Sequence, residues 1–186
     1  MGKLFGMDRA MKGGVGTSSI QGPKGIIVGA LVVVNAFGDV VDPVSNQILA
    51  GARISKKSPR LANSSNCMKR GVAREKFGAI PRSNSHRLNT TLGVVATNAQ
   101  FTKKELHQVA QIAHSGLAKT ISPLHTTFDG DLIFAISLGK KKGDVNTIGL
   151  LGDQALIESV ERAVTKADGL GVIPAYRDLI GLKRKV

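Results

Sequence analysis

The sequence is poor in aromatic side chains, with no tryptophan, one tyrosine and six phenylalanines among 186 residues. It has a single cysteine, Cys67, which excludes an internal disulfide and has no second thiol or histidine nearby at the spacing of a metal site. No apolar run is long enough to cross a bilayer, and residues 1–11 lack the apolar stretch of a signal peptide. We therefore expect one soluble, cytoplasmic domain that makes no membrane contact.

Acidic side chains are also scarce, because 26 lysines and arginines face 13 aspartates and glutamates and give a formal net charge of +13. The excess is concentrated in residues 53–88, which carry ten basic side chains and one acidic one. This segment is rich in Ser, Asn, Lys and Arg and shows no sustained helical or alternating pattern. We interpret it as a flexible basic linker and prefer that interpretation to nucleic-acid binding, which such charge also permits.

Three apolar runs predict strands. The first extends from Gly25 to Val34 after a glycine-rich turn at Gly13 to Ser18, and the others are Leu92 to Ala96 and Leu132 to Leu138. The apolarity of the first run is continuous rather than alternating, and the second run resembles it, which indicates strands that are buried on both faces.

Two segments carry helical patterns. Thr102 followed by Glu105 forms a capping box ahead of apolar residues at helical spacing, and predicts a helix from about Lys103 to Ala118. Asp153 is the predicted cap of a second long helix that ends near Gly169. Because strands precede helices without strict alternation, we predict an α+β fold in which helices pack on stacked sheets.

The string Asn89-Thr90-Thr91 lies where the basic linker meets a predicted buried strand. The peptide bond between Asn89 and Thr90 would be accessible on the linker side, while the strand holds the threonines rigidly. Self-cleavage requires both an accessible bond and a fixed nucleophile. If the chain is cut between Asn89 and Thr90, the new α-amino group, with an ordinary pKa of about 7.7 to 8.0, can take the proton of the Thr90 hydroxyl. The same string is also common at the start of strands, so it is not specific by itself.

Two carboxylates, Asp129 and Asp131, flank one glycine in a turn that leads into the strand beginning at Leu132. If that strand pairs beside the strand beginning at Leu92, both carboxylates lie near Thr90. One of the two carboxylates could then orient the Thr90 amine and hydroxyl, while the second carboxylate holds the first one in position. A polar turn, or half of a calcium loop that lacks its other ligands, is the alternative.

Four ordered blocks of sequence resemble the L-aminopeptidase/D-esterase family of self-cleaving hydrolases, with the nearest match to its nylon-oligomer hydrolase branch. The blocks are Met11 to Gly16, Val34 to Asp39, Asn89 to Ala99 and Pro123 to Asp131. The resemblance implies a partial αββα sandwich of the N-terminal-nucleophile type and a precursor that cleaves itself into two associated subunits. It also implies hydrolysis of short peptides or oligoamides without a metal or other cofactor.

Carried over by position, the resemblance assigns five site residues. Thr90 matches the nucleophile, Asp129 and Asp131 match the acidic pair beside it, and Lys12 and Asn35 match polar residues that line the site. The Asn35 amide could donate to a developing oxyanion, and Lys12 could stabilise negative charge or tune the Thr90 amine.

The same resemblance divides the chain into three parts. Residues 1–52 match the end of the first subunit, residues 53–88 form the linker, and residues 90–186 match the second subunit. Family members carry a further segment of sheet and helix ahead of the position of Met1. We therefore expect an N-terminally truncated chain that takes the missing part from a separate chain, or an inactive remnant. We also expect a homo-oligomer. An acyltransferase of the same type remains an open alternative to the hydrolase.

We do not assign catalytic or metal-binding roles to the other polar residues. His125 could act as an acid or base, but an N-terminal threonine supplies its own base, so we favour a structural or gatekeeping role. His107 and His114 lack a third ligand for a metal, and the lysines at 140–142 are interpreted as a solvated turn. Thr91 competes with Thr90 as the nucleophile, and only the family register favours Thr90.

Overall fold

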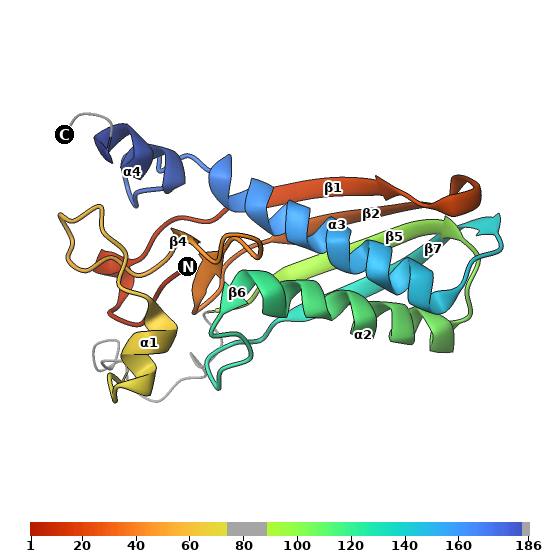
Figure 1. Ribbon diagram of the computed structural model, residues 1–186, viewed down its shortest axis with the longest axis horizontal. Coiled ribbons are helices and arrows are strands. Elements are labelled where there is room, and N and C mark those ends of the chain that lie inside the picture. The colour runs from red at the N-terminus through yellow and green to blue at the C-terminus, as the bar shows by residue number, and fades with distance from the viewer. Residues whose placement is uncertain (74–88, 184–186) are drawn as a thin grey trace.

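The computed structural model describes residues 1–73 and 89–183. A sheet of four strands in the order β1-β2-β5-β7 extends along the molecule, and a smaller sheet in the order β4-β3-β6 lies at one end (Figure 1). The elements, in chain order, are β1 (Val15–Gln21), β2 (Ile27–Val33), β3 (Asp39–Val41), β4 (Ile48–Ala50), α1 (Ser64–Lys69), β5 (Leu92–Ala99), α2 (Lys103–Thr120), β6 (Ile121–Ser122), β7 (Leu132–Lys141), α3 (Val145–Thr165) and α4 (Tyr176–Lys183).

The three strands predicted from apolar runs are confirmed as β2, β5 and β7. Strand β2 pairs antiparallel with both β1 and β5, whereas β5 pairs with β7 in parallel. The predicted turn at Gly13 to Ser18 is wrong, because most of it lies in β1. Gly16 lies in that strand and faces helix α3. The position requires glycine because a side chain there would overlap the carbonyl oxygen of Ser159.

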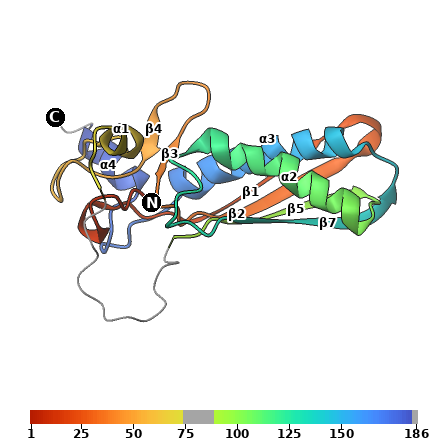
Figure 2. The ribbon, with the colours of Figure 1, turned by 90° about the horizontal axis from the view of Figure 1, so that it is seen from below.

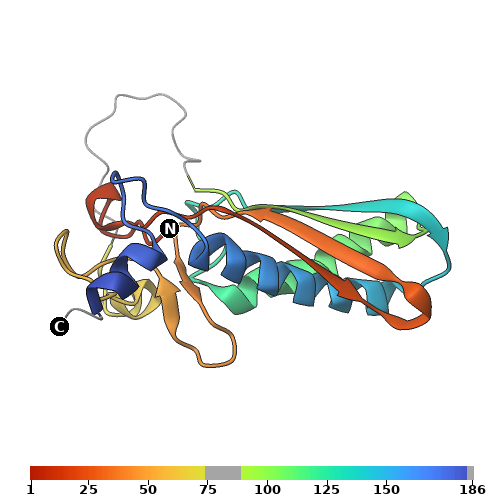
Figure 3. The same cartoon turned by 90° about the horizontal axis from the view of Figure 1, so that it is seen from above.

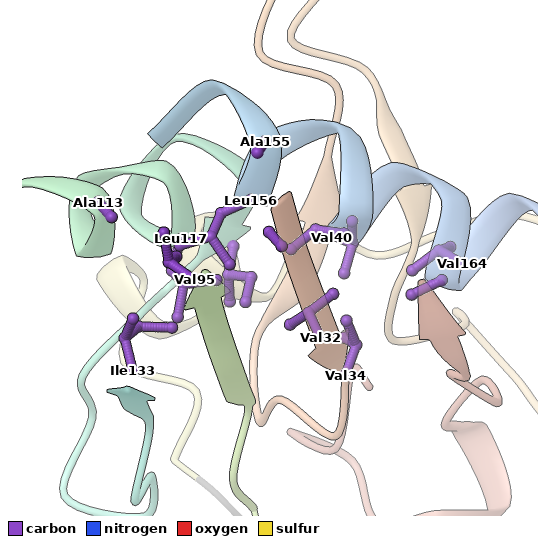
Figure 4. Close-up of a cluster of buried hydrophobic side chains, with 14 of the residues drawn as sticks. Val32, Val34, Val40, Val95, Ala113, Leu117, Ile133, Ala155, Leu156 and Val164 are labelled. Carbon is purple, nitrogen blue, oxygen red and sulfur yellow. The ribbon is translucent and has the colours of Figure 1, made fainter. Parts of the chain in front are cut away.

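Helices α2 and α3 cover one face of the large sheet, as Figure 2 shows. Their buried side chains meet those of alternate strand residues in a continuous apolar core, part of which is drawn in Figure 4. Leu117 of α2 and Leu156 of α3 lie above Val95 of β5, and all three are fully buried. At about 25 cal/mol per Å² of buried apolar surface, each such leucine contributes about 1.5–3 kcal/mol to folding.

The opposite face of the large sheet is uncovered by any described element, and we call it the open face (Figures 2 and 3). Burial alternates along each strand, so the prediction of strands buried on both faces is wrong for this chain. Nine large apolar side chains are exposed on the open face: Val15, Ile27, Leu31, Val33, Leu92, Leu132, Phe134, Ile136 and Leu138. A sheet face that exposes this many large apolar side chains is typical of a surface that another layer or partner covers.

The first predicted helix is confirmed as α2, and both bonds of the Thr102–Glu105 capping box are present. The second begins earlier than predicted, because Asp144 caps α3 and Asp153 lies within it, 2.7 Å from Lys119 of α2. Gly149 lies in the first turns of α3, where an added Cβ would come within 2.7 Å of Ile112 on α2. No described helix has the length and apolarity needed to cross a membrane.

The expectation of a flexible linker is wrong for residues 53–73, which are folded against the smaller sheet. Arg53 is buried and donates a hydrogen bond to the carbonyl oxygen of Asp8. Helix α1 is capped by Asn63, and its Ser64 donates both its N–H and its hydroxyl to the buried carboxylate of Asp39. Specific polar contacts, which apolar periodicity does not reveal, order this segment. The remainder of the predicted linker, residues 74–88, lies outside the described residues.

Packing of α3 on β1 can be tested with two glycine substitutions. Gly16→Ala places a methyl group against the backbone of α3, and should lower the free energy of unfolding by about 3 kcal/mol. Gly29→Ala is the matched control, since its nearest neighbour would lie 3.6 Å away, and it should change stability by less than about 1 kcal/mol. Urea unfolding followed by circular dichroism measures both. Equal losses would contradict the assigned contact.

Candidate active site

The parallel pairing of β5 with β7 brings the two candidate motifs side by side. Leu92 is the register partner of Leu132, and the ladder continues upstream, where Asn89 bridges Asp129. The N–H of Leu132 donates to the carbonyl oxygen of Thr91 at 3.0 Å. The two strands therefore pair, which is the condition under which both carboxylates are expected near Thr90. This pairing places the Asn89–Thr91 segment next to the turn that holds both carboxylates.

The peptide bond between Asn89 and Thr90 is held from two sides. The N–H of Gly130 donates to the carbonyl oxygen of Asn89 at 2.9 Å, and the N–H of Thr90 donates to the carbonyl oxygen of Asn35 at 3.1 Å. The Thr90 hydroxyl oxygen lies close to Gly130, where an added Cβ would be 3.1 Å from it. The N–H of Gly130 thus polarises the Asn89 carbonyl, which precedes the candidate nucleophile. The absence of a side chain at Gly130 leaves room for the Thr90 hydroxyl.

The two carboxylates have different surroundings, and Asp129 is fully engaged. Its Oδ1 accepts from the N–H of Phe37 at 3.1 Å. Its Oδ2 accepts from the N–H of Thr126 at 3.1 Å and from the Thr126 hydroxyl at 2.6 Å. Asp129 therefore ties its own turn to the loop that follows Asn35, and its contacts are those of a positioning group.

Asp131 has one engaged oxygen and one orphaned oxygen. Its Oδ1 accepts from the N–H of Thr91 at 2.7 Å, whereas its buried Oδ2 has no hydrogen-bond partner among the described residues. Burial raises the pKa of the Asp131 carboxyl, the Thr91 N–H opposes that rise, and the charge of Asp129 adds to it. A buried carboxylate with a raised pKa beside a candidate nucleophile is suited to accept a proton.

The lysine that meets Asn35 is Lys3, which sequence analysis missed. Its Nζ donates to Asn35 Oδ1 at 2.6 Å and to the Asn35 carbonyl oxygen at 3.1 Å. Lys12, which the family resemblance assigns to the site, donates its backbone N–H to the carbonyl oxygen of Pro174. The role of its side chain at the site stays a prediction. The only signal in the sequence was that Lys3 directly precedes the apolar residues Leu4 and Phe5, since a lysine that enters a core with such neighbours requires a polar partner.

Histidines form the outer side of the site. His125 Nδ1 lies 3.9 Å from Asp131 Oδ2, and its ring packs edge-on against His114 of α2 with 4.7 Å between ring centroids. His107 is exposed on the same helix. Within residues 1–73 and 89–183, no group of three histidine, cysteine, aspartate or glutamate side chains is placed to hold a metal ion. The site therefore combines a hydroxyl, a backbone donor, a buried carboxylate, a lysine and an imidazole.

Comparison with known sequences gives consistent matches along most of the chain. The sequence model of peptidase family S58 matches residues 6–171. An uncharacterised aminopeptidase of Mycobacterium leprae is 36% identical over 89% of this chain and 48% of its own length. One from Mycobacterium tuberculosis is 32% identical over 91% of this chain and 53% of its own length. The chain thus spans about half the length of these relatives.

Two further comparisons concern the nylon-oligomer branch and the fold. A 6-aminohexanoate-oligomer endohydrolase of Kocuria is 41% identical over 49 residues, which are 26% of this chain and 14% of that protein. The L-aminopeptidase D-Ala-esterase/amidase of Ochrobactrum anthropi, described as a variant of the N-terminal-nucleophile hydrolase fold, superposes with a TM-score of 0.57 at 18% identity, over 95% of this chain and 49% of that one. This likeness confirms the predicted partial fold. The chain belongs to peptidase family S58, the L-aminopeptidase/D-esterase group that its motifs resemble.

Proposed function

We propose that this chain is the nucleophile-bearing half of a self-cleaving amide hydrolase, in which the Asn89–Thr90 bond is cut and Thr90 becomes the N-terminal nucleophile. The observation that carries the proposal is the way this bond is held. Its carbonyl oxygen accepts from Gly130, its nitrogen donates to Asn35, and the Thr90 hydroxyl lies against Gly130. These contacts support an intramolecular attack of the hydroxyl on the preceding carbonyl, because they hold the bond rigidly and place a donor on its carbonyl oxygen.

The cleavage proceeds in two steps. The Thr90 oxygen attacks the carbonyl carbon of Asn89 while Asp131 accepts the hydroxyl proton, and the N–H of Gly130 stabilises the negative oxygen that develops. The C–N bond then breaks, the proton passes to the Thr90 nitrogen, and an ester joins Asn89 to the Thr90 oxygen. Water hydrolyses that ester, which leaves a carboxylate on Asn89 and a free amine and hydroxyl on Thr90.

The new amine serves as the base for substrate hydrolysis. It inherits the contact with the Asn35 carbonyl oxygen, which also accepts from Lys3. Because both nitrogens contact one oxygen, the positive charge of Lys3 lies close to the amine and favours its neutral, proton-accepting form. We propose short peptides or oligoamides as substrates, attacked at an amide carbonyl to give an ester on Thr90 and then released by water.

We further propose that a second β-sheet layer covers the open face. The open face reaches the candidate site, because its residues Val33, Leu92 and Leu132 are within two positions in the chain of Asn35, Thr90 and Asp131, respectively. The covering layer would therefore also form a wall of the site. The occupant we assign is a polypeptide equivalent to the part of the mycobacterial relatives that this chain does not span, which is about half of their length. The continuous apolarity of β2 and β5 fits strands that are buried on both faces in that assembly.

Self-cleavage is tested by the intact mass of the purified chain over time, alone and with the polypeptide that supplies the second layer. We expect two fragments that part between Asn89 and Thr90, and an uncut Thr90→Ala variant. Thr90→Ser, which keeps a hydroxyl, should still be cut. A chain that keeps its full mass in both settings would refute the proposal, and a cut one residue later would assign the nucleophile to Thr91.

Substitution of Gly130 tests whether the hydroxyl is held as described. In Gly130→Ala the N–H that polarises Asn89 is retained, but the added methyl group lies 3.1 Å from the Thr90 hydroxyl and displaces it. We expect cleavage that is roughly tenfold slower. Gly130 is exposed, so the unfolding midpoint should change little and serves as the control. A variant that cleaves at the original rate would exclude this placement of the nucleophile.

The partner proposal is tested by co-expression with the corresponding unmatched segment of the Mycobacterium tuberculosis relative. Phe134→Lys puts a charge on the open face, where Phe134 is 53% exposed, and should weaken co-purification at least about tenfold. Leu150→Lys is the matched control, because Leu150 is 61% exposed on α3, on the helical side of the sheet. Equal effects of both changes, or a stable dimer of this chain through the open face, would overturn the assigned occupant.

A further inference from the structure

The orphaned oxygen of Asp131 faces a side chain that the mechanism above does not use. His125 Nδ1 lies 3.9 Å from this oxygen, and the two groups differ sharply in exposure. The side chain of Asp131 is 0% exposed and that of His125 is 57% exposed. The imidazole therefore stands between a buried carboxylate and the solvent, at a distance that a small rotation of the ring converts into a hydrogen bond.

His125 is held in this place by its backbone and by a second ring. Its φ of 54° lies in the left-handed region, which is uncommon for residues other than glycine and often marks a functional position. The ring of His114 packs against it edge-on, at an interplanar angle of 70°. Burial lowers the pKa of His114, and the charge of His125 lowers it further, so both influences favour the neutral form of the ring that packs against His125.

We propose that His125 is a positioning residue for Asp131, whose carboxylate it keeps charged and directed toward the backbone at Thr90 and Thr91. The proposal rests on the function proposed above and adds a residue that acts through Asp131. In its cationic form the imidazole supplies the missing partner of Oδ2, while the N–H of Thr91 continues to hold Oδ1.

The charges around His125 and Asp131 determine whether removal of the imidazole raises or lowers the pKa of Asp131. Asp129 faces Asp131 from the same turn, and His114 faces His125 from α2. Burial and the charge of Asp129 raise the pKa of Asp131, whereas the Thr91 N–H and the charge of His125 lower it. Removing the imidazole leaves the raising influences less opposed. A larger fraction of Asp131 is then protonated at mildly acidic pH, where it can no longer accept a proton.

The first test measures Asp131 itself and does not require cleavage. In the full chain carrying Thr90→Ala, the carboxyl carbon of Asp131 is followed by NMR across a pH titration and assigned with Asp131→Asn. His125→Asn removes the charge with a residue that tolerates a positive φ. We expect the Asp131 titration to move to higher pH, and to stay unchanged in the control His107→Asn. An Asp131 titration that is unaffected by His125→Asn would overturn the proposal.

The second test is the pH profile of self-cleavage. His125→Asn should be roughly fivefold slower than the parent chain at pH 6 and within about twofold of it at pH 8.5. His125→Lys, which restores a positive charge, should recover the acidic limb. Equal slowing at all pH values would indicate a structural role and refute the proposal. A parent chain that never cleaves would refute the proposed function instead, and the NMR titration would still decide the role of His125.

Discussion

The parallel pairing of β5 with β7 is the contact on which the candidate site depends. It aligns Leu92 with Leu132, and the same ladder holds Asn89 against the turn before β7. Parallel strands need a long crossover, and here α2 provides it while also covering the sheet. One connection thus builds the core and carries the Asp-Gly-Asp turn back to the threonine. A slip by one residue would turn the apolar side chains of the strand to the wrong face, so the apolar core maintains the register of the site.

The pairing also explains why two carboxylates so close in sequence have different chemistry. Asp129 pairs with Asn89, and its two carboxylate oxygens accept hydrogen bonds from the N–H of Phe37 and from Thr126. Asp131 lies one step further along, where its side chain is buried and a single N–H satisfies one of its oxygens. The residue with unmet hydrogen-bonding capacity is the one whose pKa rises through burial. Backbone geometry therefore gives the two carboxylates different surroundings, which suit the different roles that we propose for them.

The open face connects the shape of the chain with its membership of a family of longer proteins. The helical side of the large sheet is buried in a continuous apolar core, while the other side exposes branched and aromatic side chains next to the catalytic candidates. Its strands have the composition of strands buried on both faces, which made the sequence-based prediction wrong for this chain. The same error is informative, because the composition of the strands reflects the assembly that we propose and not this chain by itself.

The sequence by itself determined the local elements and the motifs. The Thr102 capping box and the apolar spacing predicted α2, continuous apolar runs predicted β5 and β7, and the motifs around Thr90 and Asp131 indicated the family. Only the tertiary structure paired Lys3 with Asn35, folded residues 53–73 and brought His125 next to Asp131. The physical reason is that capping and periodicity act within a few residues of chain, whereas the contacts of Lys3 with Asn35 and of Ser64 with Asp39 join groups 32 and 25 residues apart. These contacts depend on how the elements pack, which no local pattern in the sequence records.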